Sequence, residues 1–276
     1  MTIGELLAWA RQRLVPREGM RFPEREARAF LAWLLHTEEA RILAHPERAV
    51  EEAVARQFYQ FVQRRSGGEP FHLILGWCPF YGRQFAVAPG VLIPRPETEL
   101  VVQAVLRLPL PSQPRILDVG TGSGVLAITL ALELPQAQVW ASDTSWGALQ
   151  VARRNAARLH ARVRLALAHL ARPWCGGFHL VVANLPYVPE SLQGALPPEL
   201  AFEDPAALFG GPDGLALIRP LVADLPRLLV RRGFAALELG PGQAEVLASH
   251  LPTGLEPQDL VYDLGGTARV LVLRRT

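Results

Sequence analysis

Residues 115–124 read RILDVGTGSG and decide the fold class of the chain. A short apolar strand at 115–119 runs directly into a turn with glycine at every second position, and an apolar segment of helical length follows at 125–134. Glycines at such a turn permit positive φ and let the backbone approach a ligand closely. The stretch therefore predicts a strand–turn–helix unit of an α/β fold, with a small-molecule site at the turn.

From about residue 96 to the C-terminus, strand-like and helix-like segments alternate around this unit. We expect strands at 115–119, 138–142, 163–167, 179–183 and 234–239, with two more at the C-terminal end. We expect helices at 125–134, 146–159, 215–229 and 243–250. Such alternation predicts an α/β fold with a mainly parallel seven-stranded sheet and helices on both of its faces.

The part of the chain before residue 96 has a different pattern. Apolar residues recur at helical spacing through residues 1 to about 66, and Thr2 with Glu5 forms a capping box at the first helix. Residues 69–95 alternate apolar residues around glycines, beginning at 71–75, which is typical of a β-hairpin. The sequence therefore predicts a helical domain over 1–68, a β-hairpin linker over 69–95 and the α/β domain over 96–276.

Composition excludes several classes of protein. Cys78 and Cys175 lie far apart without a CxxC pair and the histidines lack metal-ligand spacing, so we expect reduced thiols and no metal. The longest apolar run, 124–132, is too short to cross a membrane, and no signal-peptide pattern is present. The net charge of +2 comes from arginine without lysine, and no basic run with interleaved aromatics occurs. We expect a cytoplasmic protein without a membrane partner, and nucleic acid is not the favoured partner.

The glycine turn is the predicted cofactor site. Its GxGxG spacing differs from the GxGxxG that places a pyrophosphate at a helix N-terminus. Asp118 precedes the glycines, where a carboxylate disfavours a pyrophosphate and suits a ligand with an ammonium group. Asp143 ends the next strand, where a carboxylate can accept hydrogen bonds from both ribose hydroxyls; the alternative is a helix cap. The glycine spacing and the two acids together predict an adenosyl ligand, with S-adenosylmethionine preferred over a dinucleotide. The predicted cofactor-binding residues of this region are Asp118, Gly120, Thr121, Gly122, Ser123, Gly124 and Asp143.

Residues 184–187, Asn-Leu-Pro-Tyr, follow the strand at 179–183 and form the predicted catalytic segment. Asn184 offers a side-chain carbonyl as acceptor, and Pro186 restricts the backbone of Leu185 so that its carbonyl keeps one direction. Tyr187 supplies an aromatic face for a planar amide or base. Two carbonyls aimed at one NH2 group orient its lone pair toward a methyl donor, so catalysis is mainly positioning and electrostatics. The segment predicts methylation of an amide or amine nitrogen; a strand-ending turn without chemistry is the alternative.

Further motifs carry a family resemblance over nearly the whole chain. The most specific are Phe80-Tyr81-Gly82 with Phe85, and residues 91–99, VLIPRPETE. Others are GGPDGL at 210–215, LELG at 237–240 with Gln243, and DLGG at 263–266 with Arg269. With these motifs the chain resembles the PrmC/HemK family of protein-(glutamine-N5) methyltransferases, which modify class 1 peptide chain release factors. The resemblance implies a Rossmann-like class I methyltransferase domain that uses S-adenosylmethionine.

The resemblance also implies roles for single residues. Residues 120–124 match the family's cofactor loop and Asp143 its ribose-binding acid, while Thr98 would lie near the methionine part of the cofactor. Asn184 matches the asparagine that accepts from the glutamine amide, beside the cofactor, and residues 186–187 match the end of the family's NPPY motif.

The implied reaction moves the methyl group of S-adenosylmethionine to the side-chain N5 of the glutamine in the GGQ motif of a class 1 release factor. S-adenosylhomocysteine is the other product. Residues 1 to about 66 match the family's N-terminal domain, which is thought to engage the protein substrate.

The chain departs from the family pattern in three places, one of them a pair of residues. Leu185 replaces the first proline of NPPY, but Pro186 still constrains the carbonyl at 185, so the chemistry should be retained. His179 stands where the family usually has an aspartate. Ala168 and His169 align with an Asp-Trp pair near the adenine, so His169 is a candidate adenine contact, with a surface-loop histidine as the alternative.

Other functions remain open from the residues alone. An N6-adenine methyltransferase acting on DNA or RNA would use the same tetrapeptide on an exocyclic NH2 group, but it usually adds a basic recognition region and extracts the base from its stack. A nicotinamide-dependent oxidoreductase fits the GxGxG spacing poorly, and a non-catalytic adaptor would not need Asn184 and Tyr187.

Overall fold

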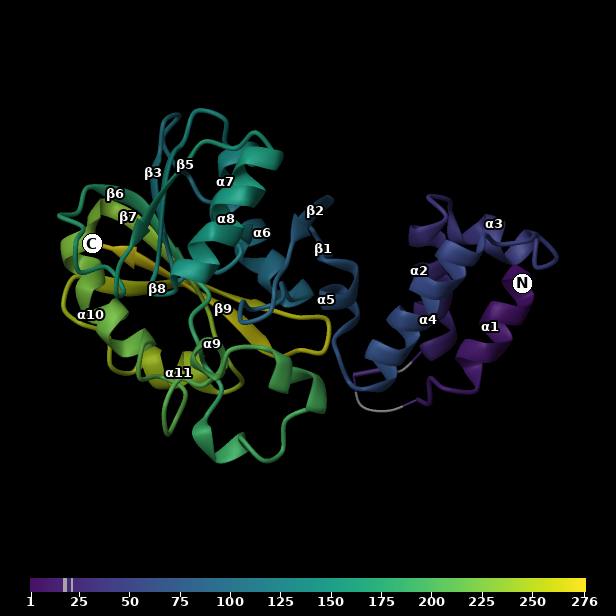
Figure 1. Cartoon of the computed structure of the whole chain (residues 1–276). Helices are drawn as coiled ribbons and strands as arrows, with labels where there is room; N and C mark the ends of the chain where they lie inside the picture. Colours follow the sequence, from purple (N-terminus) through teal and green to yellow (C-terminus); the bar gives the residue numbers. More distant parts are fainter. Residues whose placement is uncertain (17–18, 21) are drawn as a thin grey trace. The chain divides into compact units, whose positions relative to one another are not determined.

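The computed structural model describes residues 1–16, 19–20 and 22–276, and it contains two compact units. Unit 1 comprises residues 1–76 and 196–202, and unit 2 comprises residues 77–195 and 203–276. The labels of Figure 1 are used for the helices and strands of each unit. None of the described helices is both long and apolar enough to cross a membrane.

Unit 1 is helical, as the apolar periodicity predicts. Its helices are α1 (Ile3–Arg11), α2 (Pro23–Leu34), α3 (Glu39–Ala44), α4 (Glu52–Ser66) and α5 (Phe71–Leu75), with the short 3-10 helix η3 (Pro198–Phe202). The capping box is present, because the Thr2 side chain accepts from the Glu5 amide and the Glu5 side chain accepts from the Thr2 amide. Phe30 and Phe58 belong to the apolar core of this unit and are fully buried.

The strand expected at 71–75 is wrong, because these residues form helix α5. Pro70 stands at the helix N-cap, and Gly76 ends the helix in the left-handed conformation with φ +78°. Leu73 and Ile74 are adjacent and both buried, which a strand with one buried face does not allow. A β-hairpin does follow, with β1 (Trp77–Phe80) paired antiparallel to β2 (Arg83–Ala86), and it belongs to unit 2.

Unit 2 is built on the mainly parallel seven-stranded sheet that the sequence predicts. Its strands are β3 (Arg115–Val119), β4 (Gln138–Asp143), β5 (Val163–Leu167), β6 (Phe178–Ala183), β7 (Leu229–Glu238), β8 (Leu255–Tyr262) and β9 (Ala268–Arg275). The strand order is β5-β4-β3-β6-β7-β9-β8; β9 pairs antiparallel with both β7 and β8, and the other neighbouring strands pair parallel.

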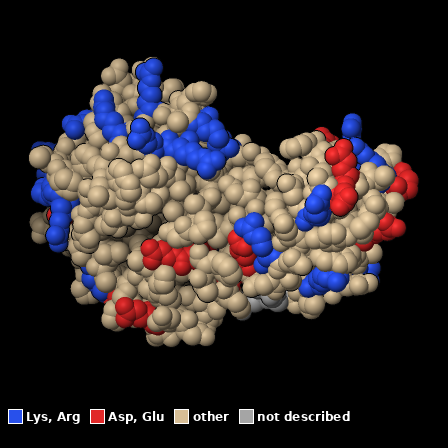
Figure 2. Space-filling view, viewed as in Figure 1, with Lys and Arg blue, Asp and Glu red and all other residues tan. Residues whose placement is uncertain are grey.

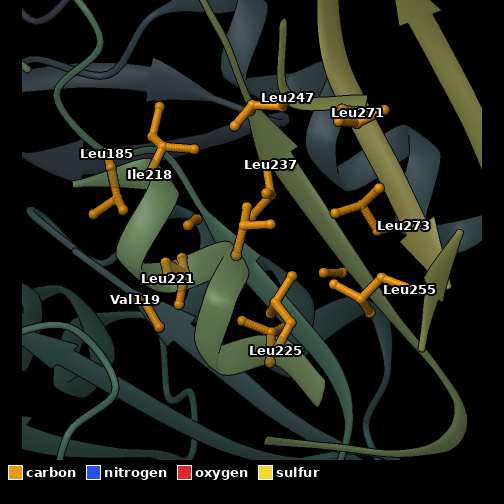
Figure 3. Close-up of a cluster of buried hydrophobic side chains, with 14 of the residues drawn as sticks. Val119, Leu185, Ile218, Leu221, Leu225, Leu237, Leu247, Leu255, Leu271 and Leu273 are labelled. Carbon is orange, nitrogen blue, oxygen red and sulfur yellow. The ribbon is translucent and has the colours of Figure 1, made fainter. Parts of the chain in front are cut away.

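Alternate residues of each central strand enter two separate apolar cores. In β6, Leu180 and Val182 face one core, while Val181 and Ala183 face the other. Helices α6 (Glu99–Leu106), α7 (Val125–Glu133) and α8 (Trp146–Arg158) contribute to the first core. Helices α10 (Ile218–Leu228) and α11 (Gln243–Ala248) cover the second, which Figure 3 shows in close-up.

Some elements were not expected from the sequence. They are α6, α9 (Pro205–Leu208) and the 3-10 helices η1 (Pro96–Thr98), η2 (Glu190–Leu192) and η3. Apart from α6 they are shorter than the two turns needed for a recognisable apolar stripe.

The register of the sheet places several strand ends side by side. Val119 pairs with Ser142 and Ala183, and Ala183 pairs with Leu237. The next residue of each strand therefore lies at the same carboxyl edge of the sheet; these residues are Gly120, Asp143, Asn184 and Glu238. The strand order reverses between β3 and β6, and in open α/β sheets ligands bind at such a switch point.

Candidate active site

A pocket of about 270 Å³ lies at this edge of unit 2. It brings together most of the residues that the sequence predicts for the site. Those that line it are Thr98, Asp118, Gly120, Thr121, Gly122, Ser123, Asp143, His169, Asn184, Leu185 and Pro186. Gly124 and Tyr187 are absent from the lining. The pocket is thus formed by the glycine turn, the end of β4 and the segment after β6.

The glycine turn needs glycine for different reasons at neighbouring positions. Gly120 has φ +75°, and a Cβ there would lie 2.6 Å from Cδ2 of Leu185, so close packing excludes a side chain. A Cβ at Gly122, with φ +56°, would meet nothing within 4 Å, which leaves that side of the turn open. Gly124 is the N-cap of α7, in the left-handed conformation, so it shapes the turn without lining the pocket.

Asp143 links the turn to the start of α8. Its Oδ2 accepts a hydrogen bond from the Gly122 amide at 2.8 Å, and its Oδ1 accepts from the Ser145 amide at 2.8 Å. The N-cap of α8 is Ser145, whose side chain accepts from the Ala148 amide. Each oxygen of Asp143 keeps a lone pair beside the pocket, so the carboxylate can still accept hydrogen bonds from a ligand.

Asp118 is fully buried below the turn. Its Oδ2 accepts from the Thr121 hydroxyl at 2.6 Å and from the Ala127 amide at 3.1 Å, which ties the turn to α7. Burial raises the pKa of Asp118 to about 7, and these hydrogen bonds act in the opposite direction. Oδ1 has no hydrogen-bond partner among the described residues. A positively charged group in the adjoining pocket would therefore be attracted by this carboxylate.

Asn184 follows β6 and has a defined side-chain direction. Its Nδ2 donates to Oγ1 of Thr98 at 3.0 Å, and Thr98 is buried. Leu185, the departure from the family pattern, is 5% exposed and packs in the second core near Ile218, as Figure 3 shows. A leucine suits this position because its side chain fills apolar space that also adjoins Gly120.

Tyr187 is held from two directions just outside the pocket. Its hydroxyl donates to Oε1 of Glu238 at 3.3 Å, and its backbone carbonyl accepts from Nε2 of Gln243 at 2.9 Å. A Cβ at Gly214 would lie 2.0 Å from that carbonyl oxygen, so only glycine fits there. Burial, followed by the charge of Glu238, raises the pKa of the Tyr187 hydroxyl. Tyr187 is therefore a neutral hydrogen-bond donor with a fixed backbone.

Several residues that support the site had no role assigned from sequence. Arg95 and Glu99 belong to the signature loop: Arg95 pairs with the buried Glu203, and Glu99 accepts from the Tyr81 amide at 2.7 Å. Asn155 of α8, fully buried, donates to the carbonyls of Ser123 and Ala86. For Glu238 a signal existed, since it lies near the end of the strand expected at 234–239 and within the LELG motif at 237–240. For Asn155 the helical pattern offered none.

Two histidines that departed from the family pattern have different positions. His169 is exposed at the pocket, in the loop after β5. Nδ1 of His179 accepts a hydrogen bond from the Arg115 amide at 3.0 Å. Burial and the neighbouring Arg115 lower the pKa of His179, which keeps it the neutral acceptor that this bond requires. His179 therefore joins two strands and lies outside the pocket.

Two family models match the chain. The one described as PrmC N-terminal domain matches residues 5–76, and the one described as methyltransferase small domain matches residues 97–195. The release factor glutamine methyltransferase of Neisseria gonorrhoeae is 39% identical over 258 residues, which cover 91% of this chain and 93% of that protein. The protein of the same name from Moorella thermoacetica is 40% identical over 251 residues, with coverages of 90% and 88%. A solved methyltransferase from Pyrococcus furiosus shares the fold, with a TM-score of 0.54 at 19% identity, over 71% of this chain and 90% of that one.

Proposed function

The chain belongs to the family of release factor glutamine methyltransferases, and we propose that it methylates the side-chain N5 of the glutamine in the GGQ motif of class 1 release factors. The methyl donor in this proposal is S-adenosylmethionine. A cytoplasmic site of action follows from a substrate that works in translation, and it stays a prediction. Unit 1 is the proposed contact for the protein substrate, since the PrmC N-terminal domain model matches it.

The observation that carries the proposal is the direction of the Asn184 amide. Because Nδ2 donates to Thr98, Oδ1 is left to accept a hydrogen bond from a substrate NH2 group. The carbonyl of Leu185, whose direction Pro186 restricts, is the proposed second acceptor. Two acceptors hold both hydrogens of one amide nitrogen, so its lone pair is directed out of the amide plane.

The pocket residues fit the proposed donor. Asp143 would accept hydrogen bonds from the ribose hydroxyls, and the open side of Gly122 leaves room for the ligand beside the turn. Asp118 would attract the ammonium group, and Thr98 would lie near the methionine part. When bound, S-adenosylmethionine supplies a methyl group on a sulfonium and leaves as S-adenosylhomocysteine. The side chains then have to orient the glutamine nitrogen and exclude water, and the proton of the methylated amide leaves to solvent.

An N6-adenine methyltransferase is the alternative, and one surface feature makes it worth testing. Residues 144–189 hold six arginines and no acidic residue. In Figure 2, blue side chains gather over the part of unit 2 where Figure 1 labels α7 and α8. The identity of 39% and 40% to release factor glutamine methyltransferases, over 91% and 90% of the chain, nevertheless favours a protein substrate.

The test uses methyl-labelled S-adenosylmethionine and three acceptors. They are a class 1 release factor, the same factor with the GGQ glutamine replaced by alanine, and total nucleic acid. We expect label in the first acceptor alone. Equal label in the alanine variant would refute glutamine as the target, and label only in nucleic acid would support the alternative.

A further inference from the structure

A row of hydrogen-bonding groups runs from the catalytic segment into the interior of unit 2. Nδ2 of Asn184 donates to Oγ1 of Thr98 at 3.0 Å. A hydroxyl that accepts through its oxygen still has one proton to donate, and the Glu238 carboxyl is the acid beside Thr98. Oε2 of Glu238 is buried without a hydrogen-bond partner among the described residues, so it is the acceptor available to that proton. Thr98 and Glu238 are each 1% exposed, so water does not compete for these groups.

Glu238 also holds the second side chain of the catalytic segment. The Tyr187 hydroxyl donates to Oε1 of Glu238 at 3.3 Å. Other charges around the carboxyl are Glu97 of η1 and Arg269 of β9, and Arg269 is itself paired with Asp263 at 2.8 Å. Glu238 does not line the pocket, so it reaches a bound ligand only through its partners.

We propose that Glu238 is a positioning residue that, through Thr98, sets the orientation of the Asn184 amide and at the same time fixes the Tyr187 hydroxyl. The inference rests on the proposed function for its kinetic test only. The sheet supplies the geometry, since β6 and β7 are neighbours and Ala183 pairs with Leu237, directly before Asn184 and Glu238.

The physical reason is the donor-to-acceptor direction, or polarity, of the hydrogen bonds that join Asn184, Thr98 and Glu238. A side-chain amide can turn over, which exchanges its oxygen and its NH2 group with little change in shape. Above its pKa of about 7, Glu238 is a carboxylate that can only accept, so it draws the Thr98 proton toward itself and turns a Thr98 lone pair toward Asn184. The NH2 group of Asn184 then faces Thr98, and Oδ1 must face the substrate. Without this polarity, Asn184 could present NH2 to the substrate NH2 group, and two donors do not form a hydrogen bond.

Glu238→Gln tests the polarity without changing the size of the side chain. A glutamine can donate to Thr98, which reverses the row, and it offers only one acceptor oxygen to two hydroxyls. Thr98→Val removes the hydroxyl at nearly constant volume, and Thr98→Ser keeps it. Glu245→Gln, on an exposed glutamate of α11, is the matched control.

The kinetic measurement is methyl transfer to the release factor, with kcat and KM separated and the Kd for S-adenosylmethionine measured by calorimetry. For Glu238→Gln and Thr98→Val we expect kcat to fall about 10- to 100-fold, the size of one lost orienting hydrogen bond. We expect both the Kd and the KM of Glu238→Gln to stay within about threefold, because Glu238 lies outside the pocket. Thr98→Ser should recover most of the lost kcat.

The double variant separates positioning from a merely structural role. The double variant carries both Glu238→Gln and Thr98→Val. If Glu238 acts through Thr98, the loss of kcat in the double variant exceeds the loss in Thr98→Val only by the effect of the changed hydrogen bond to Tyr187. Full additivity of the two losses, or a wild-type kcat in Glu238→Gln, would overturn the proposal.

A second measurement needs no substrate and no activity. The side-chain amide signals of Asn184 in an NMR spectrum can be assigned by their loss in Asn184→Ala. We expect their exchange with solvent to be at least about tenfold faster in Glu238→Gln and Thr98→Val than in the wild type and Glu245→Gln. Equal exchange rates of the Asn184 side-chain amide in all four proteins would refute the proposed role of Glu238 and Thr98 in orienting Asn184. That conclusion would hold even if no release factor were methylated. A wild type that leaves the release factor unlabelled, with exchange as expected, would instead refute the proposed function alone.

Discussion

Replacing Asp143 by alanine tests the cofactor site most directly, because this carboxylate has two tasks. It accepts the Gly122 and Ser145 amides at 2.8 Å each, and in the proposed complex it also accepts from the two ribose hydroxyls. Asp143 is partly exposed, so water can replace the carboxylate at both amides. We therefore expect the free energy of unfolding to fall by only about 1–2 kcal/mol.

The loss in free energy of cofactor binding should be at least as large as this loss in free energy of unfolding. Hydrogen bonds to a charged group contribute about 1.5–3 kcal/mol, and solvent recovers part of the loss, so we expect about 1–3 kcal/mol, or roughly 5- to 150-fold in Kd. Asp143→Asn should be no milder. Both backbone partners are N–H donors, and the asparagine NH2 group would face one of them.

The assay is calorimetric titration with S-adenosylmethionine, alongside urea unfolding of each variant. Asp259→Ala is the matched control, since this exposed carboxylate on β8 also accepts a backbone amide, that of Leu260. We expect the control to bind as the wild type does. A folded Asp143→Ala protein with unchanged Kd would refute the ribose contact and leave Asp143 as a support for the turn alone.

Three further predictions concern the catalytic segment and its support. Asn184→Ala should keep cofactor affinity within about threefold but lose about 10²–10³ in single-turnover rate, the usual effect of one lost catalytic hydrogen bond; normal turnover would remove Asn184 from the mechanism. Leu185→Pro, which restores the family residue, should keep kcat within about threefold but lower the free energy of unfolding by about 1–3 kcal/mol, because a buried leucine is lost; a dead but stable protein would contradict this. Burial raises the pKa of Glu238 from 4.5 to about 7, so between these pH values the folded state binds a proton that the unfolded state has released. The free energy of unfolding therefore falls as pH rises through this window. Glu238→Gln should therefore flatten the fall in unfolding free energy over that window, by up to about 1.4 kcal/mol per pH unit, and a wild-type slope would show that the pKa of Glu238 is not raised.

The segment at 71–75 shows that the local pattern of apolar residues does not always distinguish a strand from a short helix. Five residues with apolar side chains at alternate positions fit a strand, and they fit a short helix equally well. The decision came from Pro70 and Gly76 at its ends and from the packing of the adjacent Leu73 and Ile74. By contrast, β3 and β5 begin and end at the predicted residues, since each is a short run bounded by turns.

The signature loop shows the same limit at the level of function. The motif at 93–99 was informative as a pattern, yet the tasks of its members emerge only in three dimensions. Arg95 reaches Glu203, 108 residues away, and Thr98 reaches Asn184, 86 residues away. No periodicity in the sequence encodes such pairs, because each depends on the path of the intervening loops and on strand register.

The sequence by itself determined the α/β class, the seven strands, the position of the glycine turn and the tetrapeptide at 184–187. These features are local, since they arise from apolar periodicity, glycine conformation and proline restriction within about ten residues. Only the tertiary structure decided that Glu238 and Thr98 lie behind Asn184, that Asn155 and Gln243 hold the turn and Tyr187, and that Gly124 shapes the turn without lining the pocket. The physical reason is the sheet register, which aligns the ends of β3, β4, β6 and β7 at one edge and so brings together side chains that are distant in sequence.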